Sequence, residues 1–192
     1  MRRNSREEIL NCALELFSQK GYEAVGPAEI VEKVGVKKPT LYYFFGSKEG
    51  LLEELLCINY GKLDAQLSAA LGCESGDLHK ILTSIVNMFF NFARENKDFY
   101  LWILSMSFAP PGSKIAAISG KYHKRHYEIL FEVFSRAADR EPKLKGKEFA
   151  AAYRFLALIN AQIGLWYRGF AELNKDTVQT IADDFLYGVI PL

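Results

Sequence analysis

Apolar residues recur along this chain at spacings of three and four, and no stretch of useful length alternates apolar with polar residues. The first pattern is typical of helices with a buried face, whereas the second would indicate strands. The sequence therefore predicts an all-α protein. Two of the helices predicted before residue 50 are only about eight residues long, and those predicted after residue 70 are longer.

Start and stop signals divide the N-terminal part into four helices. A capping box at Ser5 begins the first, which ends at Lys20 before a glycine. A glycine followed by a proline begins the second, over 27–34, and a glycine turn separates it from a third over 37–45. Ser47 then caps the fourth helix. Two short helices joined by a tight glycine turn are thus expected in this part of the chain.

The longer predicted helices include one with two apolar faces, over 147–170. Such a helix needs two surfaces to bury against, and we expect the second surface to be another copy of the chain. A homodimer through 147–170 and 177–189 follows, with small side chains allowing close approach. The small residues are Ala152, Ala157, Ala161 and Gly164, and the other long helices are expected at about 77–95, 98–108 and 114–140.

Composition adds that the chain is an ordinary globular protein, since 49% of its 192 residues are hydrophobic and 24% are charged. No uncharged stretch reaches the roughly 18–20 apolar residues of a membrane span. The first residues also lack the apolar segment of a signal peptide. We therefore expect a cytoplasmic protein that has no membrane among its partners.

The net charge of +1 indicates no particular partner, because residues 1–50 hold eight Lys and Arg against seven Asp and Glu. The placement of charge is more informative. Residues 27–45 have the spacing of a helix-turn-helix, whose second helix can enter the major groove of DNA. That spacing alone is weak evidence, so the side chains of the second helix decide its interpretation.

The second helix would present lysines and hydroxyl groups that bind phosphate oxygens, while Pro39 and the Thr40 methyl group can touch thymine methyl groups. Without the motif, the same lysines would be interpreted as an ordinary solvated face. The candidate DNA-binding residues are Lys37, Lys38, Pro39, Thr40, Tyr42, Tyr43 and Lys48.

Nearly all of residues 6–56 contribute to one combined pattern. It consists of Ile9–Phe17, Gly21-Tyr22, Ile30, Gly35-Val36, Thr40-Leu41-Tyr42, Phe45, Ser47-Lys48-Glu49 and Leu51-Leu52. At these residues the sequence resembles the TetR family of bacterial transcriptional regulators. The resemblance implies a three-helix helix-turn-helix DNA-binding domain over 1–50 and a larger helical domain over 51–192, which binds a ligand and dimerises. Beyond residue 56 the likeness is one of architecture only.

The resemblance also implies roles for individual residues. It places Thr40, Tyr42 and Lys48 at phosphate-contacting positions, and it makes Lys38 and Pro39 face the bases. Members of the family are mostly repressors, and this tendency alone favours repression over activation here.

Three positions depart from the family pattern. The sequence has Val25-Gly26-Pro27 where the family usually has Thr or Ser before the second helix. The start of that helix is therefore set by the backbone of glycine and proline and not by a side-chain cap. Lys37 replaces the usual Ser cap of the recognition helix, which adds a charge but leaves N–H groups for water or DNA oxygens. Phe44 stands where Tyr is common, and we expect the Tyr43 hydroxyl to replace the lost contact.

The larger domain holds candidates for an effector pocket on the inward faces of its long helices. Asn160 is a polar residue in an apolar stretch and needs a hydrogen-bond partner, either in the protein or in a ligand. Most aromatic residues of this part are expected to be core. The pocket candidates are Phe89, Trp102, Met106, Tyr127 and Asn160.

Catalysis and metal binding find no support in the sequence. There is no nucleophile, histidine and acid pattern, no glycine-rich phosphate loop and no set of acids with metal-ligand spacing. His123 and His126 are spaced for a metal, but the lysines and arginine around them favour a solvated basic face. We therefore expect no enzyme, no cofactor and no metal site.

The sequence thus predicts a homodimeric regulator, most simply a repressor that a small apolar or aromatic effector releases from its double-stranded DNA operator. The effector would favour a dimer whose recognition helices no longer match major-groove faces about 34–36 Å apart. One alternative is a helical DNA-binding regulator without a small-molecule ligand, controlled by a protein partner. Another is a helical enzyme or scaffold that contains a helix-turn-helix-like hairpin.

Overall fold

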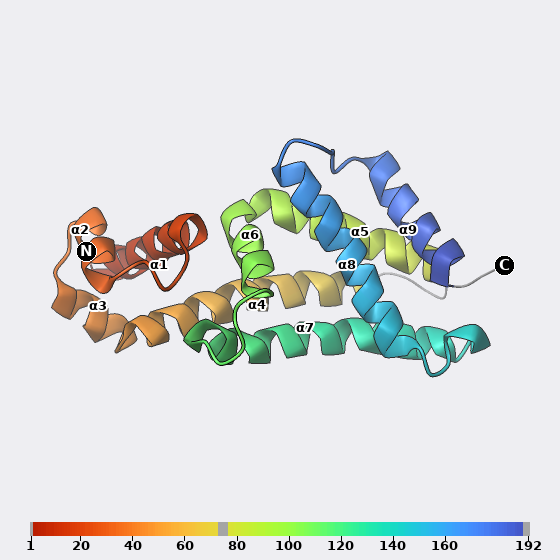
Figure 1. Ribbon diagram of the computed structural model, residues 1–192, viewed down its shortest axis with the longest axis horizontal. Helices are drawn as coiled ribbons and strands as arrows, with labels where there is room; N and C mark the ends of the chain where they lie inside the picture. Colours follow the sequence, from red (N-terminus) through yellow and green to blue (C-terminus); the bar gives the residue numbers. More distant parts are fainter. Residues whose placement is uncertain (1, 73–76, 190–192) are drawn as a thin grey trace. The chain divides into compact units, whose positions relative to one another are not determined.

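The computed structural model describes residues 2–72 and 77–189, which form helices and their connections without any strand (Figure 1). The prediction of an all-α fold is confirmed. The elements are α1 (Arg2–Lys20), α2 (Pro27–Val34), α3 (Lys38–Phe45), α4 (Lys48–Gly72), α5 (Leu78–Glu95), α6 (Lys97–Met106), α7 (Lys114–Ala138), the 3-10 helix η1 (Pro142–Leu144), α8 (Glu148–Tyr167) and α9 (Lys175–Val189).

Most helix ends lie within a few residues of those that the sequence predicts. Gly21 and Gly35 follow α1 and α2 with φ of 82° and 78°, a left-handed conformation that glycine adopts without steric cost. The capping box at Ser5 is wrong, however, because α1 begins at Arg2 and Ser5 lies inside the helix. A residue inside a helix has its own backbone in the helical conformation and therefore cannot be the N-cap.

Two compact units make up the chain. The first comprises Met1–Gly61 and Asn96–Tyr122, and the second comprises Lys62–Glu95 and His123–Leu192. The long helices α4 and α7 therefore each contribute to both units. The division between a DNA-binding domain over 1–50 and a ligand-binding domain over 51–192 is a division by function. The two compact units do not test it, and it stays a prediction.

In the first unit, α1 is the central helix, since both α2 and α6 pack against it. Phe17 lies at this junction, fully buried, with its ring centroid 5.2 Å from that of Tyr22 and 5.4 Å from that of Trp102. Aromatic pairs at such distances add a fraction of a kcal/mol to about 1.5 kcal/mol beyond the area they bury. One side chain thus connects α1, the turn after it and α6.

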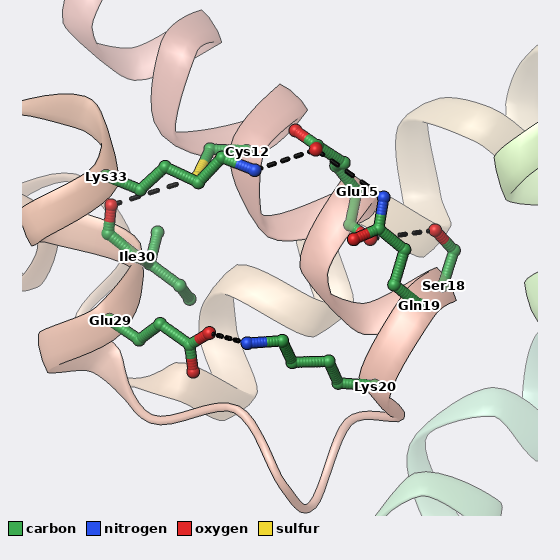
Figure 2. Close-up of polar contacts among 8 residues, drawn as sticks. All are labelled: Cys12, Glu15, Ser18, Gln19, Lys20, Glu29, Ile30 and Lys33. Atoms are coloured by element: carbon green, nitrogen blue, oxygen red, sulfur yellow. Dashed lines mark hydrogen bonds and ion pairs between the residues drawn. The ribbon is translucent and has the colours of Figure 1, made fainter.

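Polar contacts join α1 to α2 around this apolar core (Figure 2). Lys33 Nζ lies 2.7 Å from Glu15 Oε1, and Lys20 Nζ lies 2.5 Å from Glu29 Oε1. The Cys12 thiol donates to the carbonyl of Ile30 at 3.8 Å, and burial raises the pKa of this thiol. Exposed ion pairs contribute at most about 1 kcal/mol each, so the apolar contact holds the two helices together and the pairs set their register.

In the second unit, α5 packs against α8 and α9, which also pack against each other (Figure 1). Phe134 of α7, Phe155 of α8 and Phe185 of α9 meet in its core, with ring centroids 4.9–6.0 Å apart. All three are buried. Among the helices that the structure describes, none is both long and apolar enough to span a membrane.

Candidate nucleic-acid interface

The helix α3 is short and its ends are set by local backbone chemistry. Lys37 precedes it in an extended conformation, with φ −95° and ψ 152°, and Pro39 occupies its first turn. A proline there loses no helical hydrogen bond, and its fixed φ suits the helix. Gly46, with φ 72°, ends the helix and donates its N–H to the carbonyl of Tyr42 at 2.9 Å.

One face of α3 is buried and the other is open. Leu41 is fully buried and Phe45 nearly so, whereas Tyr42 is 46% exposed and Tyr43 77% exposed. At about 100° of rotation per residue, the two buried positions lie close together on the helix and define its inward face. The outward arc carries the sequence-predicted residues Lys38, Pro39, Tyr42 and Tyr43, with Lys37 exposed just before the helix and Thr40 half-buried at the edge of the arc.

The charge of this surface suits a polyanion. The segment from Lys37 to Lys48 contains three lysines and no acidic residue. No side chain caps the N-terminus of α3, where the helix dipole is positive and favours an anion. The structure therefore brings six of the seven predicted residues together on one cationic, hydroxyl-bearing surface, which we call the α3 surface: Lys37, Lys38, Pro39, Thr40, Tyr42 and Tyr43.

Lys48, the seventh candidate, lies in a different environment. It is half-buried at the first position of α4, and its Nζ donates to the backbone carbonyl of Tyr22 at 2.5 Å. The same ammonium group lies 4.0 Å from the centroid of the Tyr22 ring. Burial lowers the pKa of Lys48. Its ammonium is thus engaged within the protein, and the phosphate contact inferred from the resemblance stays a prediction.

Tyr22 is a functional candidate that the sequence reasoning did not single out. Its side chain is buried, and no described residue offers its hydroxyl group a hydrogen-bond partner. Burial raises the pKa of this hydroxyl to about 12. The available signal was the Gly21-Tyr22 pair, which contributes to the family resemblance without revealing which side chain Tyr22 contacts.

Ionic contacts hold the first half of α4 to α7 within the first unit. Lys114 Nζ lies 2.7 Å from Glu49 Oε1, and Lys121 pairs with Glu53. The Tyr122 hydroxyl donates to the backbone carbonyl of Glu53 at 3.1 Å. The helix that follows the α3 surface is therefore attached to a segment about 70 residues later in the chain.

The five effector-pocket candidates divide between the two units. Phe89, Tyr127 and Asn160 belong to the second unit, whereas Trp102 and Met106 lie on α6 in the first. Phe89 meets the His126 ring edge-on, with centroids 5.4 Å apart, and Tyr127 stacks on Tyr153 at 5.5 Å. Trp102 contacts Phe17, so it lies against a helix of the predicted DNA-binding domain.

The expectation of a solvated face around the two α7 histidines is wrong for His126. It is buried, with Nδ1 3.2 Å from Oδ1 of Asp64. Burial lowers the pKa of His123, and the nearby His126 lowers it further. The adjacent Lys124 and Arg125 are exposed as expected. In residues 2–72 and 77–189, no group of three His, Cys, Asp or Glu side chains is arranged to hold a metal ion.

Comparison with known proteins places this arrangement in a family. Residues 9–55 match the family described as bacterial regulatory proteins, tetR family. The crystal structure of PfmR, a TetR-family transcriptional regulator from Thermus thermophilus, covers 93% of this chain and 96% of its own at 25% identity, with a TM-score of 0.71. Residues 9–55 thus resemble the TetR family in sequence, and the whole chain shares the fold of a TetR-family regulator. Members of this family are transcription regulators and not enzymes.

Two relatives show how far sequence similarity to this chain extends. The transcriptional repressor ComR of Escherichia coli is 40% identical over 77 residues, which are 40% of this chain but only 37% of ComR. The transcriptional regulator YvkB of Bacillus subtilis is 27% identical over 82% of this chain and 80% of its own. Strong similarity is thus limited to a part of the chain.

The buried hydroxyl group of Tyr22 generates a stability prediction. Between pH 10 and 12 the folded protein keeps a proton that the unfolded chain releases, so stability falls as the pH rises through this window. The Tyr22→Phe variant removes that proton and should lose less stability there, with a difference of about 2–3 kcal/mol once the window is passed. At pH 7 it should be as stable as the parent or slightly more stable, because a buried hydroxyl without a partner is removed.

Urea unfolding at pH 7, 10 and 11.5, at one protein concentration, measures this difference. Tyr43→Phe is the matched control, since it removes an exposed hydroxyl group in place of a buried one. Equal pH dependence in Tyr22→Phe and the parent would contradict the prediction.

Proposed function

We propose that this TetR-family protein binds a specific DNA operator as a homodimer and regulates transcription, with α3 as its recognition helix. The observation that carries the proposal is the division of α3 into a buried face, with Leu41 and Phe45, and the exposed cationic α3 surface. A helix fixed in this way can enter a major groove without rearranging its own core.

Within the α3 surface, residues have different proposed roles. Lys37, Thr40 and Tyr42 contact phosphates and set the position of the helix on DNA. Lys38 and Pro39 lie at the start of the helix and contact base edges, which would give the protein its sequence preference. Tyr43 is the most exposed aromatic residue of α3, and its hydroxyl contributes a further phosphate contact.

Two lysine variants separate these roles. Lys37→Ala should weaken binding to all duplexes alike and reduce the slope of log affinity against log salt by about one, because one phosphate contact is lost. Lys38→Ala should change the preferred sequence, with a cost of roughly 1–3 kcal/mol at the base pair it contacts. Fluorescence anisotropy against duplexes selected from a random pool measures both effects.

Lys80→Ala, which removes an exposed lysine of α5, is the matched control and should leave affinity and salt slope unchanged. An unchanged sequence preference in Lys38→Ala would move Lys38 to the phosphate contacts. If the parent bound no duplex in a salt-dependent way, the helical enzyme or scaffold would be favoured instead.

The homodimer is proposed from the outer faces of α8 and α9. The small residues Ala157 and Ala161 are exposed, and Gly164 is half-buried. Ala152, which the sequence also predicts at the interface, is instead buried within its own unit. Large apolar side chains are also exposed along these helices and at the end of α8. They are Phe149, Tyr153, Leu158, Leu165, Tyr167, Phe170 and Tyr187.

Arginine substitutions in the proposed dimer interface should separate the subunits. The parent should have twice the monomer mass of 21.8 kDa in light scattering at micromolar concentration, and an obligate interface should bury upward of about 2,000 Å². Ala161→Arg combined with Leu165→Arg should give monomers, while Lys80→Glu on α5 should stay dimeric. A monomeric parent protein would rule out this interface.

The proposed effector is a small apolar or aromatic molecule that releases the operator, which would make the protein a repressor. The support is the aromatic environment in the second unit, where Phe89, His126, Tyr127 and Tyr153 form two ring pairs, and Asn160 on α8 is half-buried. The remaining candidates, Trp102 and Met106, lie on α6, which packs against α1 in the first unit, so they do not contribute to this aromatic environment. A ligand of this kind can release DNA only if it binds the two protein conformations with different affinity.

The effector proposal predicts release that depends on the second unit. A panel of apolar and aromatic small molecules is titrated into the protein–operator complex, and at least one should release the DNA. Phe89→Leu and Tyr127→Phe should shift the midpoint of release several-fold while leaving operator affinity unchanged. Lys80→Ala serves again as the control. Release by no compound of the panel would favour the regulator controlled by a protein partner.

A further inference from the structure

Lys48 differs from the other candidate DNA contacts because its ammonium group is bound within the protein and does not lie on the α3 surface. It begins α4, and only Gly46 and Ser47 separate it from the end of α3. Its ammonium group donates to the Tyr22 carbonyl at 2.5 Å, in the turn between α1 and α2. The side chain therefore connects the exit of the recognition helix to a segment 26 residues earlier in the chain.

Two aromatic rings lie near the Lys48 ammonium group. Its Nζ lies 4.0 Å from the Tyr22 ring centroid and 6.0 Å from that of Phe17. Cation–π contacts of this kind stabilise a partly desolvated cation. Phe17 in turn contacts Trp102, so the rings of Trp102, Phe17 and Tyr22 form a continuous row from α6 to the turn after α1, where the Lys48 ammonium lies.

The connection between α3 and α4 is short and hydrogen-bonded. Gly46 donates to the Tyr42 carbonyl at 2.9 Å, and the Ser47 hydroxyl accepts the N–H of Gly50 at 3.0 Å. Leu51 donates to the Ser47 carbonyl at 3.1 Å. Since each residue of the connection is held, a displacement of the start of α4 displaces the end of α3 with it.

We propose, on the basis of the DNA-binding function above, that Lys48 is a positioning residue: by anchoring the start of α4 to Tyr22, it orients α3, and it supports DNA affinity through this geometry and not through a phosphate contact. The nearby acid Glu49 does not provide this anchor, because its carboxylate pairs with Lys114 at 2.7 Å. The carbonyl and ring of Tyr22 are the partners that hold the Lys48 ammonium in place.

The two possible roles of Lys48 differ in their salt dependence. A lysine that neutralises a phosphate releases a counterion, so its removal lowers the salt slope by about one. A lysine that positions a helix from within the protein changes affinity without changing the number of phosphates contacted. The slope therefore separates the roles even when the loss of affinity is the same.

The test uses Lys48→Met, which keeps most of the apolar stem, and Tyr22→Leu, which removes the ring without changing any charge. Both variants should bind the selected duplex on the order of tenfold more weakly with the parent's salt slope. The double variant should be about as weak as Lys48→Met alone, because the cation–π contact that Tyr22→Leu removes is already lost without the ammonium group. Tyr22→Phe keeps ring and carbonyl and should bind like the parent.

Lys37→Ala gives the reference for a true phosphate contact in the same assay. A slope lowered by about one in Lys48→Met, or fully additive losses in the double variant, would overturn the positioning role while leaving the DNA-binding function intact. Absence of salt-dependent binding by the parent would instead overturn the function and the positioning role together. If Tyr22→Leu does not fold, as circular dichroism would show, the slope of Lys48→Met decides alone.

Discussion

The proposed recognition helix α3 is too short to be stable by itself, and the geometry of the candidate interface depends on this constraint. Helices shorter than about 12–15 residues are marginal in water, and α3 has eight residues with a proline in its first turn. Burial of Leu41 and Phe45 supplies the missing stability and also fixes the rotation of the helix. The same two side chains that hold α3 in place thus determine which residues it exposes.

The packing around α3 depends in turn on α1, which contacts α2, α3 and α6. Phe17 is the residue of α1 where several of these connections meet, since its ring touches Tyr22 and Trp102 and lies near the Lys48 ammonium. Removing a fully buried phenylalanine typically costs about 3–5 kcal/mol. Such a loss here would affect both the stability of the unit and the orientation of α3, so the stability of the unit and the geometry of the candidate interface depend on one core.

Local signals allowed most of the fold to be predicted. Gly21 and Gly35 marked helix ends in the sequence, because a glycine adopts the left-handed backbone conformation without help from distant residues. The environments of Lys48 and His126 could not be predicted, because each depends on a partner far away in the chain: Tyr22 for one, Asp64 for the other. A lysine on a helix is exposed by default, and only the tertiary fold reveals the carbonyl that it binds.

The helices α4 and α7 both belong to two units, because the boundary between the units falls within each helix. Each helix begins in the first unit and continues into the second. In the first unit, the pairs of Glu49 with Lys114 and of Glu53 with Lys121 join the two helices on one side. The start of α4 is thus held at two places within the first unit, by these pairs to α7 and by Lys48 to Tyr22, directly after the proposed recognition helix.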